Sequence, residues 1–398
     1  MPAGPLAPAL PVGATSDQLG RLEWYDNRHG NSASAESTDP MRDETIIMPT
    51  FSHLRSPGLT AAPKKSADRP RPVNLALSLL IVGTLSLSPL GTIADAQPVP
   101  AMKRVELPKM APPELKPYAK LEIPANIEPS GLVKSRLWKD LFWAHNDSGD
   151  LPRVFAVRRD GTIYPSERYG AAHGVHIPDA VNVDWEDIAT DDQGNLVIAD
   201  FGNSEQNDRR DLCLYFIFEP HPSVGQTSVQ RKVFFAYPDQ EQIPSPISNF
   251  DAEALFFADG KFYILTKHRA DTGTTLYRLD NLEPYKTNLL TRIDSFDTQG
   301  EVTGADASAD GLRLAVLTYT GVWLFDAREP GRWFDGEIRW LPLEDGDQEA
   351  ITIDGDNLII SAGEGDGYLF EIPIASLRLV KANTRPESAP PSPAAERQ

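Results

Sequence analysis

A short residue pattern occurs five times between residues 128 and 351, and it constrains the fold more than any other feature of the chain. Each copy has an acid, any residue, a glutamate or hydroxyl residue, a small or acidic residue, and an aliphatic position. The copies are Glu128-x-Ser130-Gly131-Leu132, Asp184-x-Glu186-Asp187-Ile188, Asp251-x-Glu253-Ala254-Leu255, Glu301-x-Thr303-Gly304-Ala305 and Asp347-x-Glu349-Ala350-Ile351. Their third positions are 56, 67, 50 and 46 residues apart. Such spacing indicates an array of similar supersecondary units.

Each copy is followed by further strand-like runs. Short segments rich in Val, Ile, Leu, Phe and Tyr are separated by Asp-Gly, Gly-Asn and proline turns, without a convincing helical period. After the second copy, for example, come the runs 195–200, 213–218 and 232–237. Four strands per unit is the composition of a propeller blade. The sequence therefore predicts an all-β fold, a β-propeller with five four-stranded blades.

The fifth unit lacks an outer strand, because only the runs 357–361 and 368–372 follow its motif. Residues 119–123, just before the first motif, can supply that strand, which closes the ring and removes an exposed sheet edge. A sixth blade is the alternative, and it would have to lie in the 67-residue interval or before Tyr118. A β-sandwich also has alternating strands, but it does not explain five copies of one motif.

The N-terminal region differs in composition from the propeller. Residues 1–72 mix Pro, Ser, Gly, Ala and charges, so we expect them to be disordered or to precede the true start site. Residues 73–96 follow several Lys and Arg, contain an apolar core of about 14 residues, and end in Ala94-Asp95-Ala96, a pattern typical of a secretory signal peptide. A membrane-spanning helix is the alternative, but it needs about 20 apolar residues, and Ser86 and Pro89 interrupt the run.

These segments predict the organisation and location of the protein. We expect a linker at 97–117, the propeller at 118–380 and a disordered tail at 381–398. The protein is expected to be secreted or periplasmic and monomeric, without a stable membrane span after signal cleavage; an uncleaved signal would anchor it to the membrane.

Charge and cysteine content exclude some functions. The chain has 38 Lys and Arg against 57 Asp and Glu, a net charge of -19, which argues against a nucleic-acid partner. The single cysteine, Cys213, excludes an intramolecular disulfide and a cysteine-based zinc site.

The repeated acids predict a cation site in the channel. The first strand of each blade lines the channel, and residues two apart share a face. This arrangement places Glu128, Asp184, Asp251, Glu301 and Asp347 at one level and Glu186, Glu253 and Glu349, with Ser130 and Thr303, at the next. Converging carboxylates repel each other unless a cation compensates them. Oxygen-only ligands favour Ca²⁺ or Mg²⁺; we expect Ca²⁺, bound among Asp184, Glu186, Asp251, Glu253, Asp347 and Glu349.

Two other interpretations of the acids remain open. They could accept backbone N–H bonds from a neighbouring strand and tie the blades together without a metal. Alternatively, Glu186 or Glu253 could serve as a catalytic acid or base, with Lys267 and His268 as further catalytic residues.

Polar clusters end the second strand of each blade, at one expected rim where ligands bind. From these clusters we select Asn146, Asp147 and Asn203, together with Arg210, as candidates for substrate binding. Lys267, His268 and Arg210 could also hold an anionic substrate or be ordinary solvated charges. The chain contains no Gly-x-Ser-x-Gly elbow, His-Glu-x-x-His motif or Walker loop.

Segments over roughly residues 130–270 resemble bacterial exported propellers described as phytase-like or esterase-like. The similar segments are Ser130-Gly131-Leu132, His145-Asn146-Asp147-Ser148-Gly149, Asp184-Trp185-Glu186-Asp187-Ile188-Ala189, Ala199-Asp200-Phe201-Gly202-Asn203, Asp251-Ala252-Glu253-Ala254-Leu255 and Thr266-Lys267. The resemblance implies a propeller, calcium in its channel, and hydrolysis of a phosphoester, ester or lactone. The enzymes of that group are six-bladed, whereas this chain has five repeats, so only the acidic channel positions are carried over. The alternative function is a non-catalytic propeller whose rim binds an envelope protein or glycan.

Overall fold

The computed structural model describes residues 101–122, 128–166, 168–170, 173–204, 207–344, 346–362 and 367–381. The predicted extension 1–72, the predicted signal peptide 73–96 and all but the first residue of the predicted tail 381–398 lie outside the described residues. In the part of the chain that is described, no helix has the length and apolar character needed to cross a membrane.

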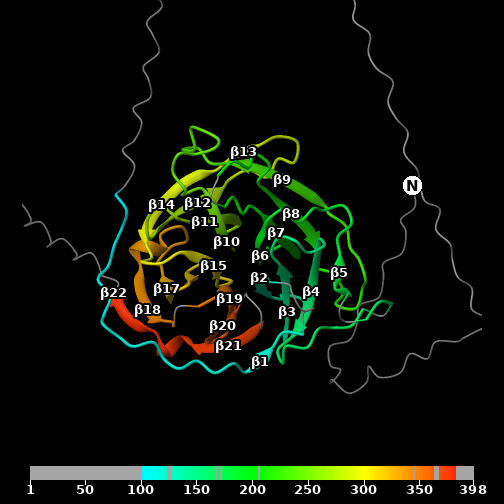
Figure 1. The fold of residues 1–398 in the computed structure, drawn as a ribbon, viewed down its shortest axis with the longest axis horizontal. Coiled ribbons are helices and arrows are strands. Elements are labelled where there is room, and N and C mark those ends of the chain that lie inside the picture. The colour runs from blue at the N-terminus through cyan, green and yellow to red at the C-terminus, as the bar shows by residue number, and fades with distance from the viewer. Residues whose placement is uncertain are drawn as a thin grey trace, which may run out of the picture. The chain divides into compact units, whose positions relative to one another are not determined.

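Five β-sheets form a ring in the described structure (Figure 1). Blade 1 is β2 (Pro129–Lys134), β3 (Leu141–Asn146), β4 (Arg153–Arg158) and β5 (Val175–His176); blade 2 is β6 (Trp185–Thr190), β7 (Asn195–Asp200), β8 (Cys213–Phe218) and β9 (Arg231–Ala236); blade 3 is β10 (Asp251–Ala258), β11 (Lys261–Lys267), β12 (Gly273–Leu279) and β14 (Thr291–Asp297); blade 4 is β15 (Val302–Ala307), β16 (Arg313–Thr318), β17 (Gly321–Asp326) and β18 (Glu337–Pro342); blade 5 is β19 (Gln348–Asp354), β20 (Asn357–Ala362), β21 (Tyr368–Pro373) and β1 (Ala119–Lys120). The innermost strands contact one another in the closed order β2, β6, β10, β15, β19 and back to β2. The predicted five-bladed propeller is confirmed.

Two short strands extend this plan. β13 (Asn288–Leu289) pairs in parallel with β9 of blade 2, and β22 (Arg378–Lys381) pairs with β18 of blade 4. The sequence analysis predicted neither strand, because both are brief and lie next to turns.

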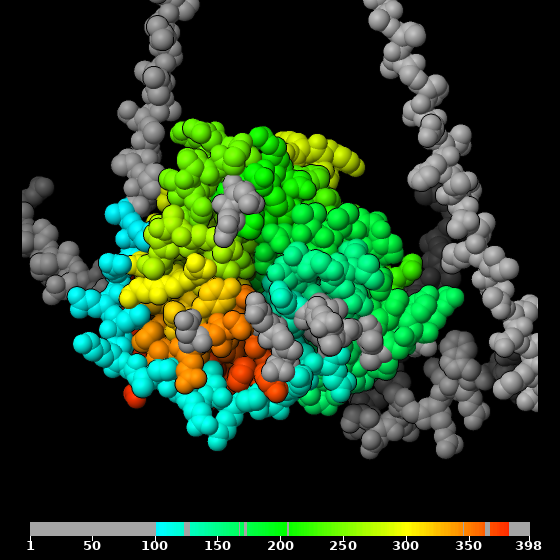
Figure 2. All heavy atoms as spheres, viewed as in Figure 1, coloured from blue at the N-terminus to red at the C-terminus, as the bar shows by residue number. Residues whose placement is uncertain are grey.

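The N-terminal strand closes the ring, as predicted. β1 pairs with β21 through Ala119↔Leu369 and Lys120↔Tyr368, and the N–H of Leu121 donates to the carbonyl of Gly367. Further upstream, Lys103 forms a parallel bridge with Phe296 in β14 of blade 3. In Figure 2 this cyan segment follows the outer edge of the orange and red blades. The segment from Lys103 to Glu122 therefore joins several blades from outside, and we call it the N-terminal belt.

Hydrophobic clusters lie between neighbouring blades, one in each of the five interfaces. The interface between blades 3 and 4 is rich in aromatic side chains, with Phe256, Phe296, Trp323 and Trp333 fully buried. Each blade is thus apolar on both faces. Burial of these side chains holds the ring together and leaves the inner strands to present polar groups.

A β-bulge interrupts the inner strand of every blade at an equivalent point. The residues skipped by the strand register are Ser130, Glu186, Glu253, Thr303 and Glu349. These residues are the third positions of the five sequence copies. A bulge leaves its extra residue outside the ladder and re-aims the side chain, commonly beside a functional site. The repeated pattern therefore encodes a bulge, where the sequence analysis assumed simple alternation along the strand.

The residue after each bulge is glycine or alanine in four blades and Asp187 in the fifth. Asp187 is fully buried, and its Oδ2 accepts the N–H of Leu255 in blade 3 at 2.7 Å and that of Ala305 in blade 4 at 3.5 Å. Its Oδ1 accepts the N–H of Ile188 at 2.8 Å. Because blades 2 and 4 are not neighbours in the ring, this carboxyl group lies at the axis and joins three blades.

Candidate metal centre

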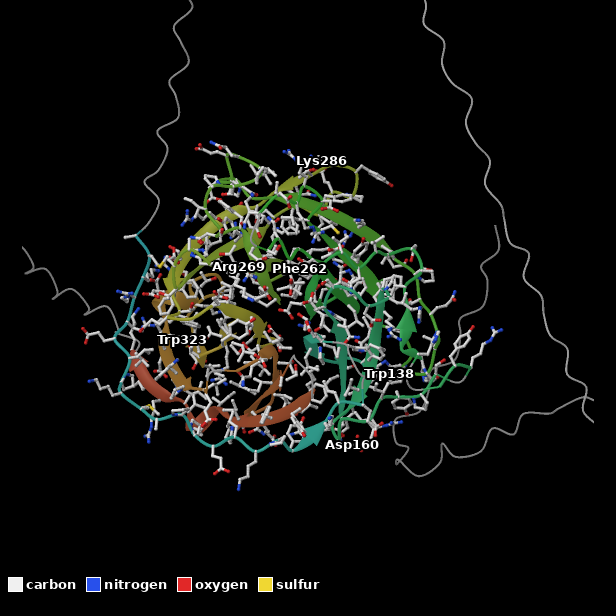
Figure 3. All side chains as sticks on the ribbon, in the orientation of Figure 1. Trp138, Asp160, Phe262, Arg269, Lys286 and Trp323 are labelled. Carbon is white, nitrogen blue, oxygen red and sulfur yellow. The ribbon has the colours of Figure 1, made fainter. Side chains whose placement is uncertain are left out.

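A cavity of about 260 Å³ opens into the ring between the inner strands. The described residues that line it are Glu128, Ser130, Asp147, Asp184, Glu186, Ser204, Asp251, Glu253, Lys267, Arg269, Tyr319 and Glu349. Seven of these are acidic and two are basic. Figure 3 shows Arg269 close to the middle of the ring, whereas Lys286 lies at its outer edge. The lining is therefore strongly acidic, and its charges are unevenly distributed.

Three carboxylates gather on one side of the cavity, and we call them the acidic half. One oxygen from each of Asp147, Asp184 and Glu186 lies within 4.8 Å of the others. Asp147 follows β3, Asp184 precedes β6, and Glu186 is the bulge residue of β6. The side-chain amide of Asn182 donates to the carbonyl of Asp147 at 2.7 Å and so fastens the two loops together. Within the described chain, no Lys or Arg forms an ion pair with these three carboxylates.

Burial disfavours the charged forms of this group. It raises the pKa of Asp184 to about 6, and the charges of Asp147 and Asp251 add to the effect. Burial also raises the pKa of Glu186 well above its usual range, with further contributions from Glu253 and Asp147. Carboxylates that are crowded and desolvated in this way ionise readily only when a cation is present.

Gly202 provides the space in which two of these carboxylates meet. A Cβ atom at Gly202 would lie 2.2 Å from Glu186 Oε1 and 2.4 Å from Asp184 Oδ2. Any side chain at this position would therefore displace both carboxylates. The backbone thus approaches the acidic half so closely that only glycine is compatible with the observed arrangement.

This contact gives a first prediction. Gly202→Ala should remove the response of the melting temperature to calcium, because the added methyl group occupies the space of Glu186 and Asp184. Thermal unfolding with calcium and with chelator measures the response. Gly346→Ala is the control, because its Cβ would face the flexible end of the Gln348 side chain. A Gly202→Ala protein with an undiminished calcium response would contradict the assignment of the acidic half as a cation site.

The opposite side of the cavity is internally neutralised, and we call it the paired half. Lys267 Nζ lies 2.9 Å from Glu253 Oε1 and 3.0 Å from the Tyr319 hydroxyl, which donates to Glu349 Oε1 at 2.9 Å. Burial and the charge of Lys267 have opposite effects on Glu253, and the pKa of Glu253 rises to about 8. Burial also raises the pKa of Glu349 to about 7.

Arg269 completes the paired half. Its guanidinium lies 2.8 Å from Asp251 Oδ2 and 3.7 Å from Glu253 Oε1. Asp251 Oδ1 also accepts the backbone N–H of Asn203 from blade 2 at 2.7 Å. Asp251 thus combines an ion pair with a backbone tie between blades.

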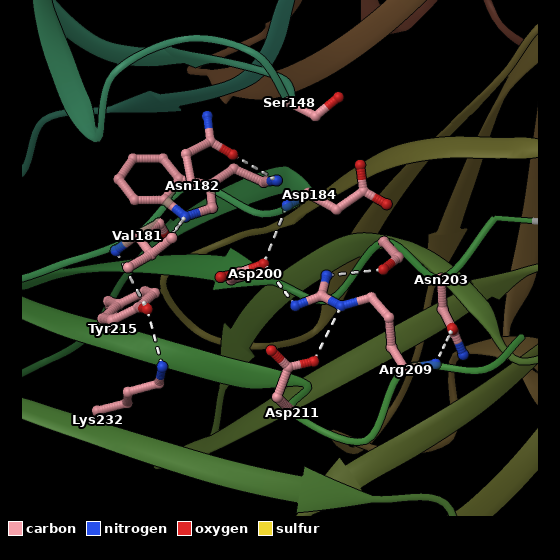
Figure 4. Close-up of polar contacts among 12 residues, drawn as sticks. Ser148, Val181, Asn182, Asp184, Asp200, Asn203, Arg209, Asp211, Tyr215 and Lys232 are labelled. Carbon is pink, nitrogen blue, oxygen red and sulfur yellow. Dashed lines mark hydrogen bonds and ion pairs between the residues drawn. The ribbon is translucent and has the colours of Figure 1, made fainter. Parts of the chain in front are cut away.

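A second ion pair stands behind the acidic half. Arg209 Nη2 lies 2.8 Å from Asp200 Oδ1, which also accepts the N–H of Asp184 at 3.1 Å. Figure 4 shows Arg209 bonded to Asp200 and Asp211, with the Asp184 carboxylate outside this network. Asp200 therefore positions the backbone of Asp184 while Arg209 neutralises Asp200.

The bulge hydroxyls act as ties between blades. Ser130 Oγ donates to the carbonyl of Glu186, and Thr303 Oγ1 donates to the carbonyl of Gln348, both at 2.7 Å. Among the described residues, the bulge glutamates accept no backbone N–H. Blade-tying by acids is instead the role of Asp187, Asp251 and Asp306, which accepts the N–H of Ile353 at 2.8 Å.

Several predicted site residues lie outside the cavity lining. Asp347 is exposed, and Arg210 donates to the carbonyl of Ile243 at 3.0 Å. His268 is buried and bonds to Asp271 at 2.7 Å. Asn146 and Asn203 are buried beside the site, where Asn203 Oδ1 accepts the N–H of Arg209.

The structure also adds residues that the sequence analysis did not select. Arg269, Tyr319 and Ser204 line the cavity, and Arg209, the neighbour of the predicted Arg210, supports it. Tyr319 belongs to the polar cluster that follows the second strand of blade 4, and Arg269 lies two residues after Lys267. Their positions at the rim were the available signal, but the pairing partners depend on the ring geometry.

Comparison with known proteins finds no matching family model and no matching curated protein. Solved structures with some likeness include a gluconolactonase from Xanthomonas campestris, with 15% identity over 71% of this chain and 99% of that chain, at a TM-score of 0.34. A chain of a nidogen/laminin complex has 15% identity over 63% of this chain and 82% of its own length, with a TM-score of 0.34. The propeller domain of Cps50 (Swd1) from Myceliophteria thermophila has 12% identity over 62% and 83%, with a TM-score of 0.32. At these values the comparisons carry no argument about activity.

Proposed function

We propose that the protein is an exported propeller that binds a divalent cation, calcium by preference, at Asp147, Asp184 and Glu186, and hydrolyses a small phosphoester, ester or lactone in the same cavity. The observation that carries the proposal is the acidic half itself: three converging carboxylates without a Lys or Arg partner in the described chain. The donors are all oxygens, which suits a hard cation. The space left by Gly202 fits carboxylates gathered around one ion.

A bound cation would polarise a substrate oxygen and lower the pKa of a coordinated water. The chain itself supplies the remaining groups. Glu253, across the cavity, can accept a proton from the attacking water, since one of its oxygens bonds to Lys267 and the other has no described hydrogen-bond partner. Lys267 holds Glu253 in place and contributes a positive charge near the developing negative charge of the substrate. Glu186, the other candidate base, is assigned to the cation.

Metal analysis of the purified protein, followed by assays on phosphoesters, esters and lactones with and without chelator, tests this function. We expect bound calcium and a hydrolysis that chelator abolishes and calcium restores. Calcium binding without turnover of any of these substrates would leave the rival function, a non-catalytic propeller that binds an envelope protein or glycan at its rim. Turnover unaffected by chelator would refute the role of the cation.

The cation affinity should depend on pH. Because the pKa of Asp184 is raised to about 6, this ligand is protonated below that pH, and the cation must displace the proton. Calcium affinity should therefore rise as the pH increases from about 5 to about 8, by up to about tenfold per pH unit for each proton displaced. Calorimetric titrations at several pH values provide the measurement. A dissociation constant that is constant over this range would contradict ligation by Asp184.

A further inference from the structure

The paired half of the cavity contains a cation that belongs to the chain. We propose that the Lys267 ammonium takes the place of a second metal ion, so that the channel binds one divalent cation although its carboxylates could serve two. The inference deepens the proposed function and rests on it for the location of the first cation. It makes Lys267 the residue that sets the metal stoichiometry.

The symmetry of the ring supports this role. Glu186, Glu253 and Glu349 occupy equivalent bulge positions on three inner strands, so their carboxylates approach the cavity from equivalent directions. Glu186 joins the acidic half. Glu253 bonds to Lys267 directly, and Glu349 is linked to it through the Tyr319 hydroxyl. The ammonium thus lies where an ion shared by Glu253 and Glu349 would have to bind.

The oxygen partners of Lys267 are those that a hard cation would choose. The ammonium offers donors only, and it contacts a carboxylate oxygen and a phenol oxygen while lying 4.8 Å from the centre of the Tyr319 ring. The Lys267 side chain is only 5% exposed and that of Glu253 only 6%. A lysine is rarely buried to this extent without a charge partner, because desolvation of its ammonium is costly.

Charge balance distinguishes the two halves. In the paired half, Lys267 and Arg269 face Asp251 and Glu253, so the described ion pairs cancel there. In the acidic half no such compensation exists among the described residues. One external divalent ion therefore has a strong electrostatic reason to bind, and a second one would meet a positive charge already in place.

Replacement of Lys267 should create the second site. Lys267→Met keeps the length of the side chain but removes the charge, and Lys267→Gln also retains a donor for Glu253. We expect the wild type to bind one calcium ion and each variant to bind two, as measured by calorimetry and by metal content after dialysis against calcium. Lys286→Met, a substitution at the outer edge of the ring, should keep a stoichiometry of one. Circular dichroism establishes which variants are folded.

A second pair of proteins separates this inference from the proposed function. Asp184→Asn should bind no calcium, and Lys267→Met combined with Asp184→Asn should bind one ion, at Glu253 and Glu349. If the wild type binds none but Lys267→Met binds one, the proposed cation site fails and the role of Lys267 stands. If the folded Lys267→Met and Lys267→Gln proteins both bind the same number of ions as the wild type, the inference is overturned.

Discussion

A chain that lacks the N-terminal belt is expected to aggregate or to melt on the order of 10 °C lower than the chain that begins at residue 97. The deletion of everything before residue 123 removes β1, so β21 becomes an exposed sheet edge. It also removes Leu121, which is 4% exposed, and the bridge between Lys103 and Phe296. Loss of one buried leucine side chain alone costs about 2–5 kcal/mol.

The effect should be specific to the end that closes the ring. Deletion of residues 383–398 serves as the control and should leave the melting temperature unchanged. Differential scanning calorimetry of both truncated chains, with light scattering to detect aggregation, gives the comparison. Similar melting temperatures for the two truncations would show that closure by β1 contributes little to stability.

Asp187→Ala is expected to be the most destabilising single substitution in the inner strands. Three backbone N–H groups, from Ile188, Leu255 and Ala305, lose their acceptor in a fully buried environment. An unsatisfied buried donor costs about 1–3 kcal/mol, so the loss should be on the order of 3–6 kcal/mol. Asp187→Asn should be milder, since its amide oxygen can still accept the two bonds now made by Oδ2.

Chemical denaturation of these variants measures the free energy of unfolding. Asp356→Ala, at an exposed turn, is the matched control and should lie within about 0.5 kcal/mol of the wild type. Equal stabilities of Asp187→Ala and Asp356→Ala would show that the axial carboxyl group does not hold the blades together. An Asp187→Asn protein as unstable as Asp187→Ala would instead assign the effect to the lost charge.

The fold was largely predictable because its signals are local and repeated. The runs 195–200 and 213–218 coincide with β7 and β8, since turn residues bound each apolar segment. Closure by the N-terminal strand followed from the missing fourth strand of the last unit. β22 escaped prediction because a four-residue strand on the outside of a blade has little apolar character to distinguish it from a tail.

The site was predictable only in part, because its geometry depends on bulges and on contacts between blades. Alternation along a strand placed all five first-position acids at one level, yet Asp347 is exposed and Asp251 is tied to Arg269 and Asn203. The division into an acidic and a paired half arises from Lys267 and Arg269 alone. Only their distances to particular carboxylates, which come from the ring, reveal that division.

The central claim is that Asp147, Asp184 and Glu186 hold a divalent cation, and calorimetric titration of calcium into chelator-treated protein tests it most directly. We expect saturable binding by the wild type, its loss in Asp184→Asn, and its retention in Asp347→Asn, which changes the equivalent acid of blade 5 outside the cavity lining. At a hundredfold excess over the dissociation constant, binding should stabilise the fold by about 2.7 kcal/mol. Absence of binding by the wild type, or equal loss in both variants, would contradict the claim.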